Sequence, residues 1–429
     1  MVKKITNIVV LLFAVCNNLS MTIRPAWAIE QTLSVKYKTR GIEQADKGHP
    51  IVGFSTLIAD ANRDGRNEIV LSGNGYMRVF AWNGVTFEPM WKSPQFSYQY
   101  GPLTFYDISP LVPTRYLSGQ EVMLDYLVFV YVATKSGSIS ADIYRLSWGN
   151  GKYELRKESH APFDRFESSG VCGDGTTTII GRKAINDKVY LAGYKWDGAR
   201  LIEKWLGESG SETKAVGEIL GSAKKSIGAF LLENNKKIGI LSCDNGVEWK
   251  EVGRDQGQIN LWKENQIGNG KSIFGLTKVG STGELWTIQG SGSEYDYSTK
   301  LYVSQFDGKK FTPFSRVHIK GIDSNMIFNM VIVDADNDRV SEIVGVEEQI
   351  RKKIPRRNSA DEGDVLLITS NLFLAKWNGK EYEVKWHRKA IDERVQNLAV
   401  GDITGDGKKE IVVTDENGYL YVFEMPTDN

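Results

Sequence analysis

The chain has 429 residues, of which 25% are charged and 41% hydrophobic, a composition typical of a folded globular protein. Its 53 basic and 53 acidic side chains balance to a formal charge of zero, which excludes nucleic-acid binding driven by bulk positive charge. The 43 glycines, 11 prolines and 11% aromatic residues are typical of β-structure with many tight turns.

Residues 1–28 read as an export signal. A basic start precedes a short apolar run, Ile8–Val15, and the small-x-small sequence Ala26-Trp27-Ala28. We expect cleavage there, which leaves 29–429 as a single domain that is periplasmic, extracellular or on the cell surface. An uncleaved membrane anchor and lipidation of Cys16 are the alternatives. No later stretch is long and apolar enough to predict a transmembrane helix.

Cleavage would leave two cysteines, Cys172 and Cys243. An exported protein meets an oxidising environment, which permits one disulfide between them. Two small buried thiols are an equally good interpretation. The sequence leaves both open.

A short sequence recurs along the chain: an aromatic residue, then Asn or Asp with Gly, and a second aromatic residue a few positions later. Asn-Gly and Asp-Gly supply the positive φ angles of tight hairpin turns, and the flanking segments are rich in Val, Tyr, Phe and Trp. No long amphipathic helix stands out between them. The copies are Ala81-Trp82-Asn83-Gly84, Trp148-Gly149-Asn150-Gly151, Lys195-Trp196-Asp197-Gly198, Phe306-Asp307-Gly308 and Lys376-Trp377-Asn378-Gly379.

The spacing of these turns predicts seven units of about four antiparallel strands. A degenerate unit is expected near Gly246–Trp249, because the interval from Trp196 to Phe306 is about twice the others. The last unit, 398–423, lacks room for a fourth strand, which Leu33–Tyr37 would supply by closing a ring. The predicted fold is therefore all-β, a β-propeller of seven blades, with six or eight blades as alternatives.

Two further features depend on this fold. The repeated tryptophans are expected to pack between blades, because blade strands are covered on both faces; stacking on sugar rings is the alternative. The segments Phe105–Gln120 and Ile350–Asp364 break the repeat and are expected to be irregular insertions. The second is rich in Arg and Lys, which indicates either a solvated charged loop or a docking site for an acidic surface.

Three aspartate-rich segments precede predicted strands. Each has oxygen-bearing side chains at positions 1, 3, 5 and 9 of nine, and alternate residues of a tight loop can turn such side chains toward one centre. Calcium takes six to eight hard oxygen ligands, so the pattern predicts calcium sites. The expected ligands are Asp60, Asn62, Asp64 and Glu68; Asp334, Asp336, Asp338 and Glu342; and Asp402, Thr404, Asp406 and Glu410.

The three loops are not equally complete. Loop 60–68 has every expected ligand, whereas Arg339 stands where the second loop should have glycine, and Thr404 is a weaker ligand at the third position of the last loop. The last acid lies at position 9 and a strand follows at once, which distinguishes these loops from an EF-hand. Ordinary acidic turns are the alternative interpretation.

The sequence Asp-x-Asn-x-Asp-Gly-x-x-Glu-Ile-Val at 60–70 resembles the FG-GAP/VCBS repeat of integrin α-subunit propellers and many secreted bacterial proteins. Asp402–Val412 matches it again, and Asp334–Val344 matches except at Arg339. The resemblance implies a β-propeller whose calcium loops join the first two strands of certain blades. Cys172-Gly173-Asp174-Gly175 would be a degenerate copy. It implies no single function, because such proteins range from adhesion proteins to lectins to accessory domains of hydrolases.

No catalytic motif stands out. The four histidines, His49, His160, His318 and His387, lack metal-ligand spacing, and no Gly-x-Ser-x-Gly or His-Glu-x-x-His sequence occurs. We therefore predict an exported, monomeric, calcium-binding module that recognises an unidentified protein or glycan, or acts in adhesion. The alternative is a polysaccharide hydrolase or lyase with two carboxylates, or a carboxylate with His or Tyr, near the propeller axis.

Overall fold

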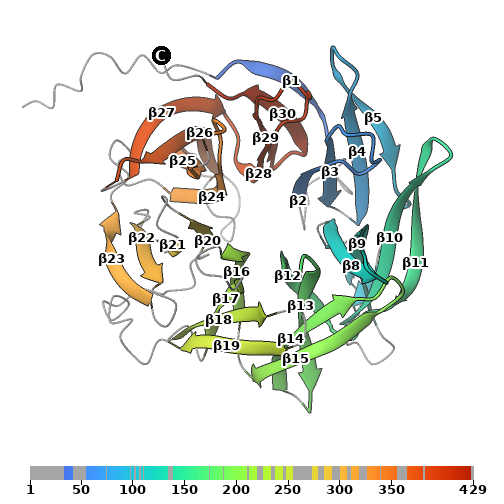
Figure 1. Ribbon diagram of the computed structural model, residues 1–429. Coiled ribbons are helices and arrows are strands. Elements are labelled where there is room, and N and C mark those ends of the chain that lie inside the picture. Colours follow the sequence, from blue (N-terminus) through green and yellow to red (C-terminus); the bar gives the residue numbers. More distant parts are fainter. Residues whose placement is uncertain are drawn as a thin grey trace, which may run out of the picture.

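The computed structural model describes residues 33–41, 55–73, 75–96, 98–100, 103–105, 108–109, 111–133, 139–172, 174–186, 188–209, 326–338, 340–354, 365–379 and 382–426, and the strands between 212 and 317. None of these segments is a helix, so no membrane-spanning helix occurs among them. Seven four-stranded antiparallel sheets surround a common centre as the blades of a β-propeller (Figure 1). The predicted fold class and blade number are confirmed.

The blades are numbered here in chain order, each from its innermost to its outermost strand. Blade I comprises β2 (Ser55–Ala59), β3 (Glu68–Gly73), β4 (Tyr76–Trp82) and β5 (Phe87–Lys92). Blade II comprises β8 (Val112–Ser118), β9 (Glu121–Ala133), β10 (Ile139–Gly149) and β11 (Lys152–His160). Blade III comprises β12 (Arg165–Val171), β13 (Thr177–Ile185), β14 (Lys188–Trp196) and β15 (Leu201–Ser209). Blade IV comprises β16 (Glu212–Ile219), β17 (Ser226–Leu232), β18 (Lys237–Asp244) and β19 (Glu248–Arg254).

Blade V comprises β20 (Ile273–Lys278), β21 (Leu285–Ser291), β22 (Lys300–Phe306) and β23 (Phe311–Val317). Blade VI comprises β24 (Met326–Val333), β25 (Glu342–Ile354), β26 (Val365–Trp377) and β27 (Tyr382–Ile391). Blade VII comprises β28 (Val395–Gly401), β29 (Glu410–Asp415), β30 (Tyr419–Glu424) and β1 (Val35–Arg40). A separate two-stranded sheet pairs β6 (Tyr98–Tyr100) with β7 (Leu103–Phe105).

Neighbouring blades share their hydrophobic cores. In β3, Ile69 and Leu71 pack in one cluster with blade VII, whereas Val70 packs in another cluster with blade II. Successive side chains of a strand point to opposite faces of the sheet, so β3, which has a neighbouring blade on each side, is buried at every residue. This is why the second strands read as continuous apolar runs such as Ile411–Val413.

The ring is closed by the two ends of the chain. β1 pairs antiparallel with β30, from Val35 opposite Phe423 to Arg40 opposite Tyr419, and forms the outermost strand of blade VII. The predicted closure by the N-terminal segment is therefore confirmed. It gives blade VII the fourth strand that its own sequence lacks and covers the edge of β30.

The recurring aromatic-Asn/Asp-Gly sequences join the third and fourth strands of their blades. Gly84, Gly198 and Gly379 have φ angles of 99°, 97° and 95°, which explains the glycine. In blade I the turn is a four-residue loop rather than a two-residue hairpin, because the side chain of Asn83 accepts hydrogen bonds from the backbone of Val85 and Thr86 at 2.9 and 2.8 Å. The degenerate unit predicted near Trp249 is blade IV, whose outermost strand contains that residue.

The repeated tryptophans pack inside the molecule. Trp196 and Trp386 are buried, and the rings of Trp91 and Tyr153 join blades I and II at 6.0 Å between their centroids. The remaining repeated tryptophans are half-buried, namely Trp82, Trp91, Trp205 and Trp377. The packing interpretation is therefore favoured over stacking on sugars. The full set is Trp82, Trp91, Trp196, Trp205, Trp377 and Trp386.

Both predicted insertions are wrong in part. Within Phe105–Gln120, residues 112–118 form β8, the innermost strand of blade II. Pro113 is tolerated there, since an innermost strand has a partner on one edge only. Within Ile350–Asp364, residues up to Ile354 belong to β25, and Ile354 pairs with Val365 of β26. Residues 355–364 lie outside the described part of the chain.

Three other predictions fall wholly or partly outside the described residues. The export signal at 1–28 lies there, so cleavage and localisation stay predictions. Cys172 is buried and disulfide-bonded. The side chain of Cys243 is not among those described, so the pairing of these two cysteines stays a prediction.

Candidate functional site

The three aspartate-rich loops each join the first strand of a blade to the second: β2 to β3, β24 to β25, and β28 to β29. They belong to blades I, VI and VII, which are consecutive around the closed ring because blade VII lies between blade VI and blade I (Figure 1). Hydrogen bonds link the loops directly. Asn67 donates to the carbonyl of Asp402 at 2.7 Å, and Asn337 donates to the carbonyl of Gly407 at 3.0 Å.

Loop 60–68 is folded around its own side chains. The carboxylate of Asp60 accepts hydrogen bonds from the backbone of Asp64 and Gly65, both at 3.0 Å. The side-chain oxygen of Asn62 accepts from the backbone of Asp64 at 2.9 Å. These bonds turn the side chains at positions 1 and 3 inward, as a shared cation would require.

Glu68, at position 9, is the first residue of β3 and is 1% exposed. One carboxylate oxygen accepts hydrogen bonds from the backbone of Ala61 and Asn62, at 2.8 and 3.3 Å. Among the described residues no Lys, Arg or His lies within ion-pair distance of it. Burial, the largest cause, raises the pKa of Glu68 from 4.5 to about 7, although the two backbone hydrogen bonds lower it.

The carboxylates of loop 334–342 pair with a lysine from another strand. Single carboxylate oxygens of Asp334, Asp336 and Asp338 lie within 4.8 Å of one another, close enough to share a metal ion. The ammonium group of Lys376, from β26, bonds to Asp336 at 2.7 Å and to Asp338, and lies 3.6 Å from Glu342. The bonds to the two aspartates, the largest causes, raise the pKa of Lys376 above its usual range.

Loop 402–410 combines the same backbone geometry with a different lysine. Asp402 accepts hydrogen bonds from the backbone of Gly405 and Gly407 at 2.7 and 2.9 Å. Thr404 donates its hydroxyl to Glu410 at 2.9 Å. The ammonium of Lys36, on β1, lies 3.3 Å from Glu410. Ring closure therefore brings the N-terminal strand to the acid at position 9.

The degenerate copy around Asp174 occupies the matching connection in blade III, between β12 and β13. Lys195 donates to Asp174 at 2.7 Å, and the pKa of Asp174 is lowered because its bonds to Lys195 and Thr176 outweigh the largest single cause, burial, which raises it. Lys195 and Lys376 both precede the repeated tryptophan, where blade I has Ala81. That recurring position was the sequence signal for these lysines, and reading the repeat as a turn motif missed it.

Each loop holds its four predicted ligands, but among the described residues only Asp334, Asp336 and Asp338 bring three acidic ligand atoms within 4.8 Å of one another. Two histidines of the described part of the chain pair with buried carboxylates: His387 contacts Glu347 and His160 contacts Asp142, both at 2.5 Å. His49 and His318 lie outside the described residues. Among the seven innermost strands, β12 contains Glu167 and β16 contains Glu212 and Glu218, whereas β2, β8, β20, β24 and β28 contain no Asp, Glu or His.

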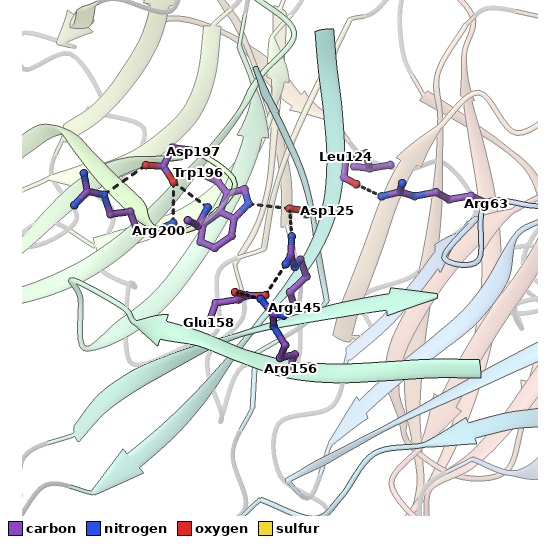
Figure 2. Close-up of polar contacts among 10 residues, drawn as sticks. Arg63, Leu124, Asp125, Arg145, Arg156, Glu158, Trp196, Asp197 and Arg200 are labelled. Carbon is purple, nitrogen blue, oxygen red and sulfur yellow. Dashed lines mark hydrogen bonds and ion pairs between the residues drawn. The ribbon is translucent and has the colours of Figure 1, made fainter. Parts of the chain in front are cut away.

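A polar cavity of about 320 Å³ lies beside loop 60–68, over the outer strands of blade II. Arg145 joins two buried carboxylates in it, at 3.4 Å from Asp125 and 2.8 Å from Glu158 (Figure 2). Arg156 lies 3.3 Å from Glu158. On the other side, the indole of Trp196 donates to Asp125 at 3.0 Å, which ties blade III to the same cluster.

Comparisons with known proteins find similarity at the level of the fold. No family model and no curated protein matches the chain. Among solved structures it is similar to the exotype rhamnogalacturonan lyase YesX, with a TM-score of 0.44 and 11% identity over 92% of this chain and 76% of that one. A Bacillus licheniformis rhamnogalacturonan lyase gives 0.42 and 13% over 93% and 76%. A Lactobacillus plantarum protein gives 0.41 and 11% over 79% and 85%.

Proposed function

We propose that this protein is an exported calcium-binding β-propeller of the FG-GAP/VCBS kind, which acts as a binding or adhesion module for a protein or glycan outside the cytoplasm. The observation that carries the calcium proposal is Glu68. Its carboxylate is buried beside Asp60 and Asp64, and the described residues offer it no cation. A buried carboxylate without a counter-charge is strongly unfavourable, and a divalent cation with oxygen ligands would neutralise this group.

The three loops are expected to differ in affinity. Loop 60–68 would bind calcium most tightly, because no lysine of the described residues pairs with its carboxylates. In loop 334–342 calcium must displace the ammonium of Lys376, and in loop 402–410 that of Lys36. The binding role is supported by the form of the molecule: the three loops of adjacent blades lie together, and a calcium ion in each would hold one rim of the propeller in a fixed shape.

Thermal unfolding of protein lacking residues 1–28 tests the calcium proposal. At a free calcium concentration about a hundredfold above its Kd, one site would stabilise the fold by about 2.7 kcal/mol. The double variant Asp60→Asn, Asp64→Asn should lose most of the calcium-dependent rise in Tm. Asp174→Asn, in the lysine-filled loop of blade III, is the matched control and should keep it. An identical Tm in calcium and in chelator would contradict the proposal.

A glycan array and a pull-down against extracellular proteins test the binding role. Calcium-loaded protein should retain a ligand that is released by chelation, because an ordered rim presents a fixed surface. Protein that gains stability from calcium yet retains no glycan or protein partner would contradict the binding role while leaving the calcium proposal intact.

A further inference from the structure

In all three aspartate-rich loops, the backbone carbonyl of the first aspartate accepts a hydrogen bond from a side chain of the blade that follows around the ring. Each of these aspartates is the first predicted calcium ligand of its loop, so the bond fixes the residue at which the site begins. The same contact recurs although the donor is a phenol, an amide or an ammonium group. The donors are Tyr126 of blade II to Asp60 at 2.8 Å, Asn67 of blade I to Asp402 at 2.7 Å, and Lys409 of blade VII to Asp334.

Two of these donors belong to an aspartate-rich loop themselves. Asn67 and Lys409 each stand at position 8 of their own loop. The next residue is the buried glutamate at position 9, Glu68 or Glu410, which is a predicted calcium ligand. The end of one loop therefore holds the beginning of the loop in the preceding blade.

Loops 334–342 and 402–410 are joined by further bonds. Asn337 donates to the carbonyl of Gly407 at 3.0 Å, and its side-chain oxygen accepts from Lys409 at 2.8 Å. Lys409 thus bonds to two residues of the neighbouring loop, and Asn337 bonds back to the loop that contains Lys409. A shift of either loop would break hydrogen bonds in both.

In the described part of the chain this series of contacts ends at blade II. That blade joins β8 directly to β9 by a tight hairpin and has no aspartate-rich loop. Tyr126, from β9, takes the place of the side chain at position 8, and Arg63 adds a bond to the carbonyl of Leu124 (Figure 2). Loop 60–68 is therefore anchored on a blade that has no such loop of its own.

These contacts have a consequence for ion binding. A calcium ion would order the loop that it binds, and this ordering costs conformational entropy. A second ion that binds where the chain is already ordered pays less of this cost, which produces positive cooperativity without a change of structure. Since position 8 adjoins the ligand at position 9, calcium in loop 60–68 would fix Asn67, and with it the first residue of loop 402–410.

We propose that the three calcium sites are coupled through these side chains and bind calcium with positive cooperativity. Asn67 links loop 60–68 to loop 402–410. Lys409 links loop 402–410 to loop 334–342. The proposal rests on the calcium binding proposed above and assigns a form of regulation to the same sites. Calcium would then fill the rim of the propeller over a narrower range of concentration than three independent sites allow.

Isothermal titration of calcium into protein lacking residues 1–28 tests the coupling. Asp→Asn substitutions at positions 1 and 5 disable a loop. In protein whose loop 334–342 is disabled, disabling loop 60–68 as well should raise the Kd of loop 402–410 by about fivefold or more. Coupling between two binding sites is reciprocal, so disabling loop 402–410 should raise the Kd of loop 60–68 by the same factor.

Asn67→Ala tests the route of this coupling, because it keeps every predicted ligand and removes only the donor. In this variant, disabling loop 60–68 should no longer change the Kd of loop 402–410. Asn329→Ala is the matched control. Asn329 also donates to a backbone carbonyl of the next blade, that of Gln396 at 3.1 Å, but it does so between β24 and β28, so its loss should leave the coupling intact.

The second link is tested in protein whose loop 60–68 is disabled. There, Lys409→Met should abolish the effect of loop 402–410 on the Kd of loop 334–342. Lys408→Met removes the same charge from the adjacent exposed position and should preserve that effect. The comparison separates the loss of a hydrogen-bond donor from the loss of a positive charge.

An unchanged Kd of loop 402–410 when loop 60–68 is disabled would overturn the proposal, since the sites would then be independent. A lower Kd would also overturn it, because repulsion between the ions would dominate. Coupling that survives Asn67→Ala would show that Asn67 does not carry it. Independent sites that still raise Tm with calcium defeat the coupling alone. If the wild type shows neither heat of binding nor a rise in Tm, the calcium proposal fails as well.

Discussion

Replacing Glu68 by glutamine should stabilise the calcium-free protein. The pKa of this buried carboxylate is raised from 4.5 to about 7, so above pH 7 the folded protein holds an ionised group that is easier to ionise in the unfolded chain. The difference corresponds to about 3 kcal/mol. Glutamine fills the same space without a charge, and its carbonyl oxygen can accept the hydrogen bonds from Ala61 and Asn62.

The sign of the effect follows from proton binding. Between pH 4.5 and about 7 the folded state holds a proton on Glu68 that the unfolded state has released, so the calcium-free protein loses stability as pH rises through this window. Glu68→Gln should therefore raise Tm in chelator by roughly 3–4 °C at pH 8, for a chain of this length, and by little near pH 4.5.

Differential scanning fluorimetry at both pH values, in chelator and in calcium, measures the effect. The same substitution removes a proposed calcium ligand, so the rise in Tm on adding calcium should shrink. Glu410→Gln is the control, because Lys36 and Thr404 already contact that carboxylate at 3.3 and 2.9 Å, and it should bring no gain. The reasoning is refuted if Glu68→Gln is no more stable than the wild type in chelator at pH 8.

Two further predictions concern Lys376 and β1. Lys376→Met should lower Tm in chelator and enlarge the rise caused by calcium, because Asp336 and Asp338 lose their ammonium partner; Lys385→Met, at a surface pair with Glu383, should change neither. Unchanged calcium response in Lys376→Met would show that the lysine does not compete with the metal. Deletion of residues 1–41 should lower Tm and produce aggregates in size-exclusion chromatography, because β30 then has an open edge; a stable monomer would contradict the closure.

Much of the fold could be predicted because its signals are local. The turn at Asn83 and Gly84 depends on hydrogen bonds from the backbone of Val85 and Thr86 to the Asn83 side chain and on one positive φ angle, so four residues suffice to predict it. Regular spacing of such turns then gave the number of blades. The same regularity predicted that blade VII needed a strand from elsewhere in the chain, and Leu33–Tyr37 was the one apolar segment placed to provide it.

The two predicted insertions show where secondary structure cannot be predicted from local sequence alone. Pro113 indicated an irregular segment, yet it lies in the innermost strand of blade II, where only one edge is paired. The basic residues Arg351, Lys352 and Lys353 indicated an irregular insertion, yet they continue β25. They do so because β26 extends alongside them and provides the hydrogen bonds. In both cases a neighbouring strand overrides the local preference.

The sequence by itself determined the turns and the ligand pattern of each aspartate-rich loop, since each depends on residues at most nine positions apart. Only the tertiary structure decided what surrounds those ligands. The register of β26 brings Lys376 to one loop and ring closure brings Lys36 to another, whereas no lysine in the described part of the chain pairs with loop 60–68. The cavity beside Arg63 likewise depends on two blades packing together. Contacts between residues far apart in the chain carry no local signal, so the charge balance of each site follows from the fold.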